Sequence, residues 1–209
     1  MKNPLFAKLL AEMPIIAILR GITPTEIPEI CDILANAGIG ILEIPLNSPD
    51  ALTSIRIAAR HCRNNQLVGA GTVLSPADVH GVYDCGGNFI ISPDTNPEVI
   101  CETNRLKMVS IPGFLTPTEA ITAIRHGADY LKLFPAVTLG ANYIREIKAV
   151  VKLPILAVGG INAENLPLFI KNCIGVGIGS SLYKAKKNPN QLAADAAALI
   201  TAVRQSSAD

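Results

Sequence analysis

The sequence is poor in charged and aromatic residues. Of its 209 residues, 17% are charged and 4% are aromatic, tryptophan is absent, and the formal net charge is +1. Nucleic-acid-binding domains usually present a basic face with aromatic side chains, so this composition argues against that class. Disorder is excluded as well, because 49% of the residues are hydrophobic and disordered chains are poor in such residues.

No apolar run is long enough for a transmembrane helix. Such a helix needs about 18 or more apolar residues, and the longest stretch without a charged residue, 64–77, is shorter and contains polar residues. The first residues, MKNPLFAKLLAEM, lack the apolar core and the small-residue cleavage site of a secretory signal. We therefore expect neither secretion nor a membrane partner.

Cysteine and histidine do not form the clusters that build disulfide frameworks or metal sites. The five cysteines are scattered and odd in number, without a CxxC pair, which favours free thiols in a reducing, cytoplasmic compartment. His61, His80 and His126 lie far apart in the sequence, so a His-built metal site is not expected. The glycines of 69–71 lack the third glycine of a dinucleotide-binding loop, which argues against a nicotinamide site.

Short apolar runs recur eight times and predict eight β-strands, with helical patterns between them. The helical patterns are 26–37, 118–125, 143–151 and 192–203, and 5–12 is typical of a leading helix. The runs are rich in Ile, Val and Leu, and they cover 15–19, 40–44, 67–70, 89–91, 108–111, 130–133, 155–158 and 174–178.

This alternation predicts an α/β fold, a (β/α)₈ TIM barrel with a leading N-terminal helix that plugs its bottom. Near-continuous apolar strands are typical of parallel strands covered on both faces, and eight strand–helix units make a closed barrel. The length fits a single domain over residues 1–209. An open doubly wound sheet is the alternative architecture.

Polar residues and glycines gather where the predicted strands end, which is the rim where barrels build their active sites. Lys132 and Glu43 interrupt apolar strands, Arg20 and Thr72 follow strands, and two glycine loops come after the last two strands. The candidate site residues are Arg20, Glu43, Thr72, Pro93, Lys132, Phe134, Gly159, Gly160, Gly179 and Ser180.

Lys132 lies in Y-L-K-L-F-P, where strand alternation places it on one face with Tyr130 and Phe134. A dry pocket favours the neutral amine of a lysine, and a neutral amine is a nucleophile that forms Schiff bases with carbonyls. The plain alternative is a lysine whose ammonium reaches solvent from the strand end.

Glu43 lies in I-L-E-I-P-L, where a carboxylate needs a partner or a function. One interpretation is a structural ion pair with Lys132 in the core. The other is a proton shuttle beside a nucleophilic lysine. Both predict contact between the two side chains, and their shared position near the C-terminal rim favours the catalytic interpretation.

The loops Gly159-Gly160 and Gly179-Ser180 follow the seventh and eighth predicted strands, where barrels often bind phosphate. Glycines let backbone N–H groups approach an anion closely, and Ser180 adds a hydroxyl donor. A simple turn is the alternative for each pair.

Arg20 ends the first predicted strand, and its planar fork suits a carboxylate. Thr72 adds a second donor for the same carboxylate. A surface arginine at a strand end is the alternative. Pro93 and Phe134 are predicted to form the walls of the site, although packing also accounts for them.

The motifs A-I-L-R-G-I-T-P, L-E-I-P-L-N-S-P, G-A-G-T-V-L, L-K-L-F-P and A-V-G-G-I occur in order between Ile15 and Ala185. With them the chain resembles the 2-keto-3-deoxy-6-phosphogluconate/galactonate aldolase family. The resemblance implies a class I aldolase on a (β/α)₈ barrel, a homotrimer that acts on a phosphorylated keto-deoxy sugar acid without metal or organic cofactor.

The resemblance also implies roles for individual residues. Lys132 matches the Schiff-base lysine, Glu43 the general acid/base, and Thr72 a ligand of the pyruvate carboxylate. The phosphate-binding loops of the family match Gly159, Gly160, Gly179 and Ser180.

Two departures from the phosphogluconate branch favour the phosphogalactonate branch of the family. Asn47 occupies the position of the arginine that holds the pyruvate carboxylate in the phosphogluconate branch, and Arg20 matches the arginine that replaces it. Val158 stands where the phosphogluconate branch has Thr before Gly-Gly. The two substrates differ in configuration at C4.

Two other hypotheses remain open from the sequence. A phosphosugar epimerase or synthase on the same barrel needs its own acid/base pair or metal ligands, and the strand ends offer Glu43 and Lys132. A non-catalytic phosphosugar-binding barrel accounts for the glycine loops, but it leaves the lysine and the glutamate with no purpose beyond an ion pair.

Overall fold

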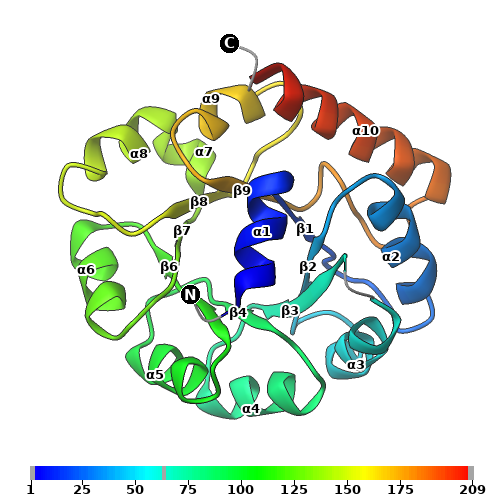
Figure 1. The fold of residues 1–209 in the computed structure, drawn as a ribbon, viewed down its shortest axis with the longest axis horizontal. Coiled ribbons are helices and arrows are strands. Elements are labelled where there is room, and N and C mark those ends of the chain that lie inside the picture. The colour runs from blue at the N-terminus through cyan, green and yellow to red at the C-terminus, as the bar shows by residue number, and fades with distance from the viewer. Residues whose placement is uncertain (1–2, 63–64, 207–209) are drawn as a thin grey trace.

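The computed structural model describes residues 3–62 and 65–206, which form an α/β barrel with helices around a ring of strands (Figure 1). The strands of the described residues are β1 (Ile15–Ile18), β2 (Ile41–Pro45), β3 (Leu67–Gly71), β4 (Phe89–Ile91), β5 (Val109–Ile111), β6 (Gly113–Phe114), β7 (Leu131–Leu133), β8 (Ile155–Val158) and β9 (Gly175–Ile178). All recorded pairings between them are parallel, in the order β5-β4-β3-β2-β1-β9-β8-β7-β6. This confirms the predicted barrel rather than an open doubly wound sheet.

The helices of the described residues lie around the ring, except α1, which crosses its centre (Figure 1). They are α1 (Pro4–Glu12), α2 (Ile27–Asn36), α3 (Ala51–His61), α4 (Pro76–Asp84), α5 (Pro97–Arg105), α6 (Pro117–Arg125), α7 (Ala136–Leu139), α8 (Ala141–Ile147), α9 (Leu166–Ile170) and α10 (Pro189–Ser206). Within the described residues, no helix combines the length and apolar character of a membrane span.

Residues that favour a helix start stand at the N-termini of α4 and α6. A proline stands in the first turn of α4 and α6, where its missing N–H costs no hydrogen bond. Ser75 and Thr116 cap these helices, each in a capping box with an acidic residue three positions on. The predicted helix 143–151 begins earlier and ends earlier, as α8, and 192–203 is extended at both ends in α10.

The described part of the chain has nine strands where the sequence predicted eight, because Pro112 separates β5 from β6. Proline has no N–H to donate to a neighbouring strand. The ring nevertheless closes here, since β6 pairs with β7 and the Lys132 N–H donates to the Pro112 carbonyl at 2.9 Å. The Asp129 N–H donates to the Ser110 carbonyl at 2.9 Å on the β5 side of the break.

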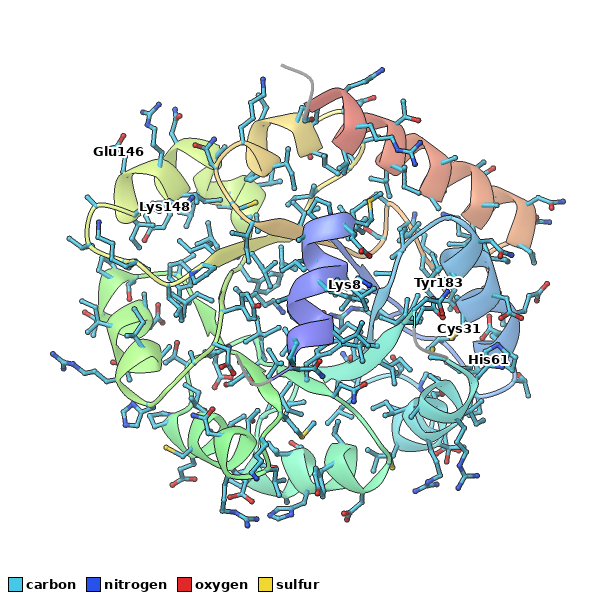
Figure 2. The ribbon with its side chains drawn as sticks, viewed as in Figure 1. Lys8, Cys31, His61, Glu146, Lys148 and Tyr183 are labelled. Carbon is cyan, nitrogen blue, oxygen red and sulfur yellow. The ribbon has the colours of Figure 1, made fainter. Side chains whose placement is uncertain are left out.

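The predicted plug is confirmed, because α1 packs on the inner face of the strands. Phe6 is fully buried, and its ring centroid lies 5.4 Å from that of Phe89 and 5.3 Å from that of Tyr130. A second apolar layer fills the space between the strands and the outer helices, and it includes Leu131 and Leu133 of β7. Charged side chains such as Glu146 lie at the periphery (Figure 2). The barrel is thus filled at one end and open to a cavity at the other.

Candidate active site

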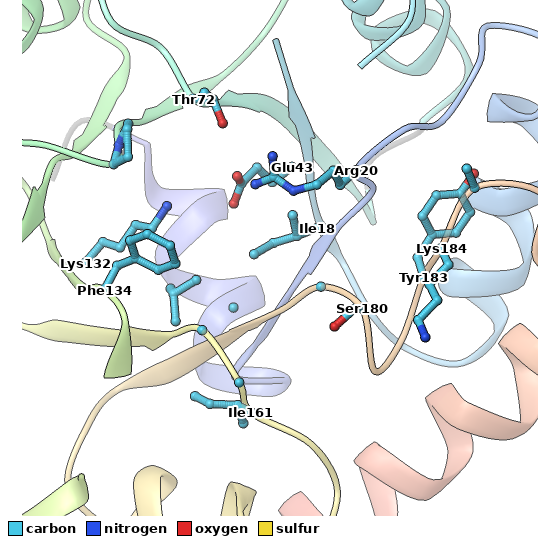
Figure 3. A pocket seen from close by; sticks show the side chains of 17 residues that line it. Ile18, Arg20, Glu43, Thr72, Lys132, Phe134, Ile161, Ser180, Tyr183 and Lys184 are labelled. Atoms are coloured by element: carbon cyan, nitrogen blue, oxygen red, sulfur yellow. The ribbon is translucent and has the colours of Figure 1, made fainter. Parts of the chain in front are cut away.

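A cavity of about 700 Å³ lies at the carboxyl ends of the strands, and it collects every candidate residue predicted from the sequence (Figure 3). Because the strands are parallel, residues at or after their carboxyl ends meet at one rim. The predicted residues that line the cavity are Arg20, Glu43, Thr72, Pro93, Lys132, Phe134, Gly159, Gly160, Gly179 and Ser180.

The cavity also has lining residues that sequence reasoning did not select as site residues. Most are apolar or small, and a residue of this kind in a strand gives no signal that separates a cavity wall from the core. Lys184 follows the last glycine loop, but the sequence does not distinguish it from Lys186 and Lys187. These further lining residues are Ile18, Val158, Ile161, Gly177, Tyr183, Lys184 and Ala185.

Glu43 is a buried carboxylate without a hydrogen-bond partner at one oxygen. Its side chain is 2% exposed on β2, and Oε2 accepts no hydrogen bond from the described residues. Burial raises the pKa of Glu43, while the charges of Lys132 and Arg20 act in the opposite direction. A Cβ at Gly71 would overlap Oε1, so the glycine on neighbouring β3 makes room for this carboxyl group.

Lys132 is a buried amine on β7, 6% exposed, with Nζ 5.0 Å from the centroid of the Phe134 ring. Burial lowers the pKa of Lys132, and the Arg20 charge lowers it further, while Glu43 raises it. Desolvation has this effect because the charged ammonium loses more hydration than the neutral amine. The amine is therefore shifted toward its nucleophilic form.

Lys132 and Glu43 line the same cavity from β7 and β2 (Figure 3). No ion pair within 4.0 Å joins these two described side chains, so the predicted direct contact is wrong in this structure. Their strands lie apart in the ring order, with β1, β9 and β8 between them. The two charges still interact across the cavity, because Lys132 lowers the pKa of Glu43 and Glu43 raises the pKa of Lys132.

Thr72 has a strained backbone at the rim. Its φ is +57°, which a β-branched residue rarely adopts, and it follows directly on β3. Such a conformation typically costs about 1–3 kcal/mol and tends to occur at functional sites. In Figure 3 its side chain lies on the same side of the cavity as Glu43.

Arg20 and Asn47 are hydrogen-bonded to each other. In the sequence analysis, Asn47 occupied the position of the phosphogluconate-branch arginine, and Arg20 matched the arginine that replaces it. The Arg20 Nη1 donates to the Asn47 Oδ1 at 3.0 Å, and the Gly21 N–H donates to the Ser48 Oγ at 3.0 Å. These bonds join the segments that follow β1 and β2. Since a guanidinium has five N–H donors, Arg20 keeps donors for a further anion.

The Gly159-Gly160 loop has a backbone that glycine alone adopts readily. The φ angles are +103° and +75°. A Cβ at Gly159 would come within 3.1 Å of Phe134, and one at Gly160 within 3.0 Å of Val137. The Asn165 Nδ2 donates to the Gly160 carbonyl at 3.0 Å and holds the loop in place.

The Gly179-Ser180 loop is linked to the Gly159-Gly160 loop by a hydrogen bond between the residues that follow each loop. The Ser181 hydroxyl donates to the Ile161 carbonyl at 2.6 Å. A Cβ at Gly179 would meet nothing closer than 3.9 Å, so packing within the protein does not require glycine there. The Ser180 hydroxyl is exposed and forms no hydrogen bond with the described residues. Both loops thus present small residues to one end of the cavity.

The histidines lie outside the cavity. The His61 ring lies 2.8 Å from Asp32 and the His80 ring 2.6 Å from Glu102, while His126 contacts the Thr122 carbonyl. In residues 3–62 and 65–206, no group of three or more His, Cys, Asp and Glu side chains is placed to hold a metal ion.

The fold and the cavity define a (β/α)₈-barrel enzyme with an amine and a carboxylate at its C-terminal rim. Residues 6–198 match the family model "Aldolase: KDPG and KHG aldolase". The chain belongs to this family of aldolases, which are carbon–carbon lyases.

Individual relatives and solved structures agree. The chain is 41% identical over 197 residues to 2-dehydro-3-deoxy-6-phosphogalactonate aldolase of Escherichia coli (strain K12), covering 93% of this chain and 96% of that protein. It is 29% identical over 182 residues to a 2-dehydro-3-deoxy-phosphogluconate aldolase of Haemophilus influenzae, covering 85% of this chain and 84% of that protein. The structure described as "Native KDPGal structure" superposes with a TM-score of 0.92 at 40% identity, covering 95% of this chain and 98% of that one.

Proposed function

We propose that this protein is a class I aldolase that cleaves 2-dehydro-3-deoxy-6-phosphogalactonate to pyruvate and glyceraldehyde 3-phosphate, with Lys132 as the Schiff-base residue. The observation that carries the proposal is a buried amine with a lowered pKa that shares a cavity with a buried, incompletely partnered carboxylate. A neutral amine attacks a ketone, and a carboxylate moves the protons that this chemistry requires.

The reaction begins with covalent capture of the substrate. The neutral Lys132 amine attacks the C2 ketone, a C–N bond forms, and the carbonyl oxygen takes up a proton. Glu43 moves protons so that this carbinolamine loses water and becomes a protonated imine. The imine then acts as an electron sink, and for this reason the step needs neither a metal nor an organic cofactor.

Cleavage of the C3–C4 bond begins when Glu43 removes a proton from the substrate. The carboxylate takes the C4 hydroxyl proton through a water molecule, the C3–C4 bond breaks, and its electron pair moves into the imine to give an enamine. The aldehyde product, glyceraldehyde 3-phosphate, departs. Protonation of the enamine at C3 and hydrolysis of the resulting imine release pyruvate and restore the amine.

Steady-state cleavage of both C4 epimers tests the substrate. We expect a higher kcat/KM for the phosphogalactonate than for the phosphogluconate. Asn47 lacks the guanidinium, and Val158 the hydroxyl, that the phosphogluconate branch has at these two positions. Similarity to the E. coli phosphogalactonate enzyme supports the same choice. A clear preference for the phosphogluconate contradicts the substrate assignment and leaves the aldolase assignment standing.

Arg20 is the proposed ligand of the pyruvate carboxylate, together with Thr72. We expect Arg20→Ala to lower kcat/KM by roughly 10- to 100-fold, the range of a charge-assisted hydrogen bond. The imine at Lys132 should still be trapped by borohydride at high pyruvate concentration. Arg60→Ala, at the end of α3 and outside the cavity, is the matched control. Unchanged kinetics in the Arg20 variant would place the carboxylate elsewhere.

We further propose that the protein is a cytoplasmic homotrimer. The family resemblance supports the trimer, and cysteines without disulfides among the described residues fit a reducing compartment.

A further inference from the structure

We propose that Lys184 is the cationic partner of the substrate phosphate and sets the preference for phosphorylated substrates. This inference rests on the proposed function, because it concerns the same cavity. Lys184 follows β9 and lines the cavity with the loops Gly159-Gly160 and Gly179-Ser180. Lys184 lies outside the phosphate-loop residues that the family resemblance implies, Gly159, Gly160, Gly179 and Ser180.

Of the basic side chains that line the cavity, Lys184 is the one best placed to balance the charge of a phosphate. Of the residues that the structure describes, three with basic side chains line the cavity: Arg20, Lys132 and Lys184. Arg20 is hydrogen-bonded to Asn47, and burial shifts Lys132 toward its neutral form. The glycines and the serine of the two loops supply neutral donors only. A phosphate monoester carries about −1.5 to −2 charges at pH 7, so the loops need a cation to balance it.

Lys184 is available for this role, whereas its neighbours are held in place. It is exposed, and its ammonium forms no ion pair or hydrogen bond with the described residues. The Tyr183 hydroxyl donates to the Glu26 Oε1 at 3.2 Å. Lys187 is paired with Asp195 and also donates to the Leu182 carbonyl.

The local backbone brings Lys184 and Ser180 to the same part of the cavity. The Gly179 carbonyl accepts hydrogen bonds from the Leu182 and Tyr183 N–H groups, both at 2.9 Å, so this segment forms a compact turn. Figure 3 shows the Lys184 amine extending toward the side on which Ser180 lies, away from Thr72. A fixed turn with one free ammonium is suited to receive an anion, because little of the backbone has to become ordered on binding.

Kinetics of Lys184→Met test the proposal, with the phosphorylated keto-deoxy acid as substrate. We expect KM to rise about tenfold or more, the effect of losing a charge-assisted hydrogen bond. The kcat should change little, because Figure 3 shows Lys184 and the proposed nucleophile Lys132 on opposite sides of the cavity. Lys184→Arg should restore most of the affinity. Lys186→Met is the matched control, since Lys186 is exposed on the same loop but does not line the cavity.

Aldehyde selectivity separates phosphate binding from a general defect. In condensation with pyruvate, Lys184→Met should lose efficiency with glyceraldehyde 3-phosphate and retain it with glyceraldehyde. Inhibition of the wild-type enzyme by inorganic phosphate should weaken in the variant. Equal losses with both aldehydes, or kinetics equal to those of Lys186→Met, overturn the role of Lys184. Trapping of pyruvate on wild-type Lys132 reports on the aldolase mechanism independently of this result.

Discussion

Lys132→Arg is expected to abolish both the cleavage of the sugar acid and the covalent capture of pyruvate. A guanidinium stays protonated at all working pH values and cannot form the imine. Arginine keeps a positive charge in the cavity, so the loss separates nucleophilicity from charge. The measurement is incubation with pyruvate and borohydride followed by mapping of the adduct by mass spectrometry. In the wild-type enzyme we expect a single modified peptide, the one that contains Lys132.

Lys8→Arg is the control for this prediction. Lys8 is exposed on α1, at the closed end of the barrel, and its ammonium lies 3.8 Å from Glu12. This variant should keep both cleavage and the adduct. An adduct on a lysine other than Lys132, or its persistence in Lys132→Arg, would overturn the assignment of the Schiff-base residue. Absence of any adduct in the wild-type enzyme would favour the non-catalytic phosphosugar-binding barrel.

Glu43→Gln should lower kcat by about 10²- to 10⁴-fold, the usual contribution of a general acid/base group. Glutamine keeps the shape of the side chain but cannot accept and return the proton of the C4 hydroxyl. Steady-state cleavage measures the loss, and a melting curve checks that the fold is retained. Turnover within a few-fold of wild type would show that Glu43 has a structural role.

The pH profile gives this prediction a second readout. Burial raises the pKa of Glu43, so its basic form appears at a higher pH than in a free glutamate. The wild-type kcat/KM profile, which reports groups of the free enzyme, should therefore have an acid-limb component above the ordinary glutamate range, and this component should be absent in Glu43→Gln. Glu12→Gln, on the exposed face of α1, should leave the profile unchanged.

The sequence determined the barrel and most of its site, for physical reasons that act locally. Parallel strands buried on both faces must be short and apolar, so the eight runs were visible as such. A lysine or a glutamate inside such a run is costly to bury, so it needs a partner or a function and is a candidate site residue. Because parallel strands end at one rim, Lys132, Glu43 and the loop glycines were predicted to share one site, and they line one cavity.

Distances between strands were decided by the tertiary structure. Lys132 and Glu43 were expected to touch, but the ring places three strands between β2 and β7. In the sequence, Arg20 and Asn47 were compared as two positions for the carboxylate-binding arginine. In the structure they are hydrogen-bonded, because β1 and β2 are neighbours. The break at Pro112 was also missed, since a single residue without an N–H changes pairing and not hydropathy.

The backbone conformation of the loops likewise could not be predicted from the sequence. Nothing in G-A-G-T indicates that Thr72 adopts a positive φ, and nothing in the lysines of 184–187 indicates which one lines the cavity. The apolar pattern specifies which side of a strand faces the core. Where a loop side chain points depends on hydrogen bonds to distant residues, such as the bond from Tyr183 to Glu26, and these form only when the barrel has closed.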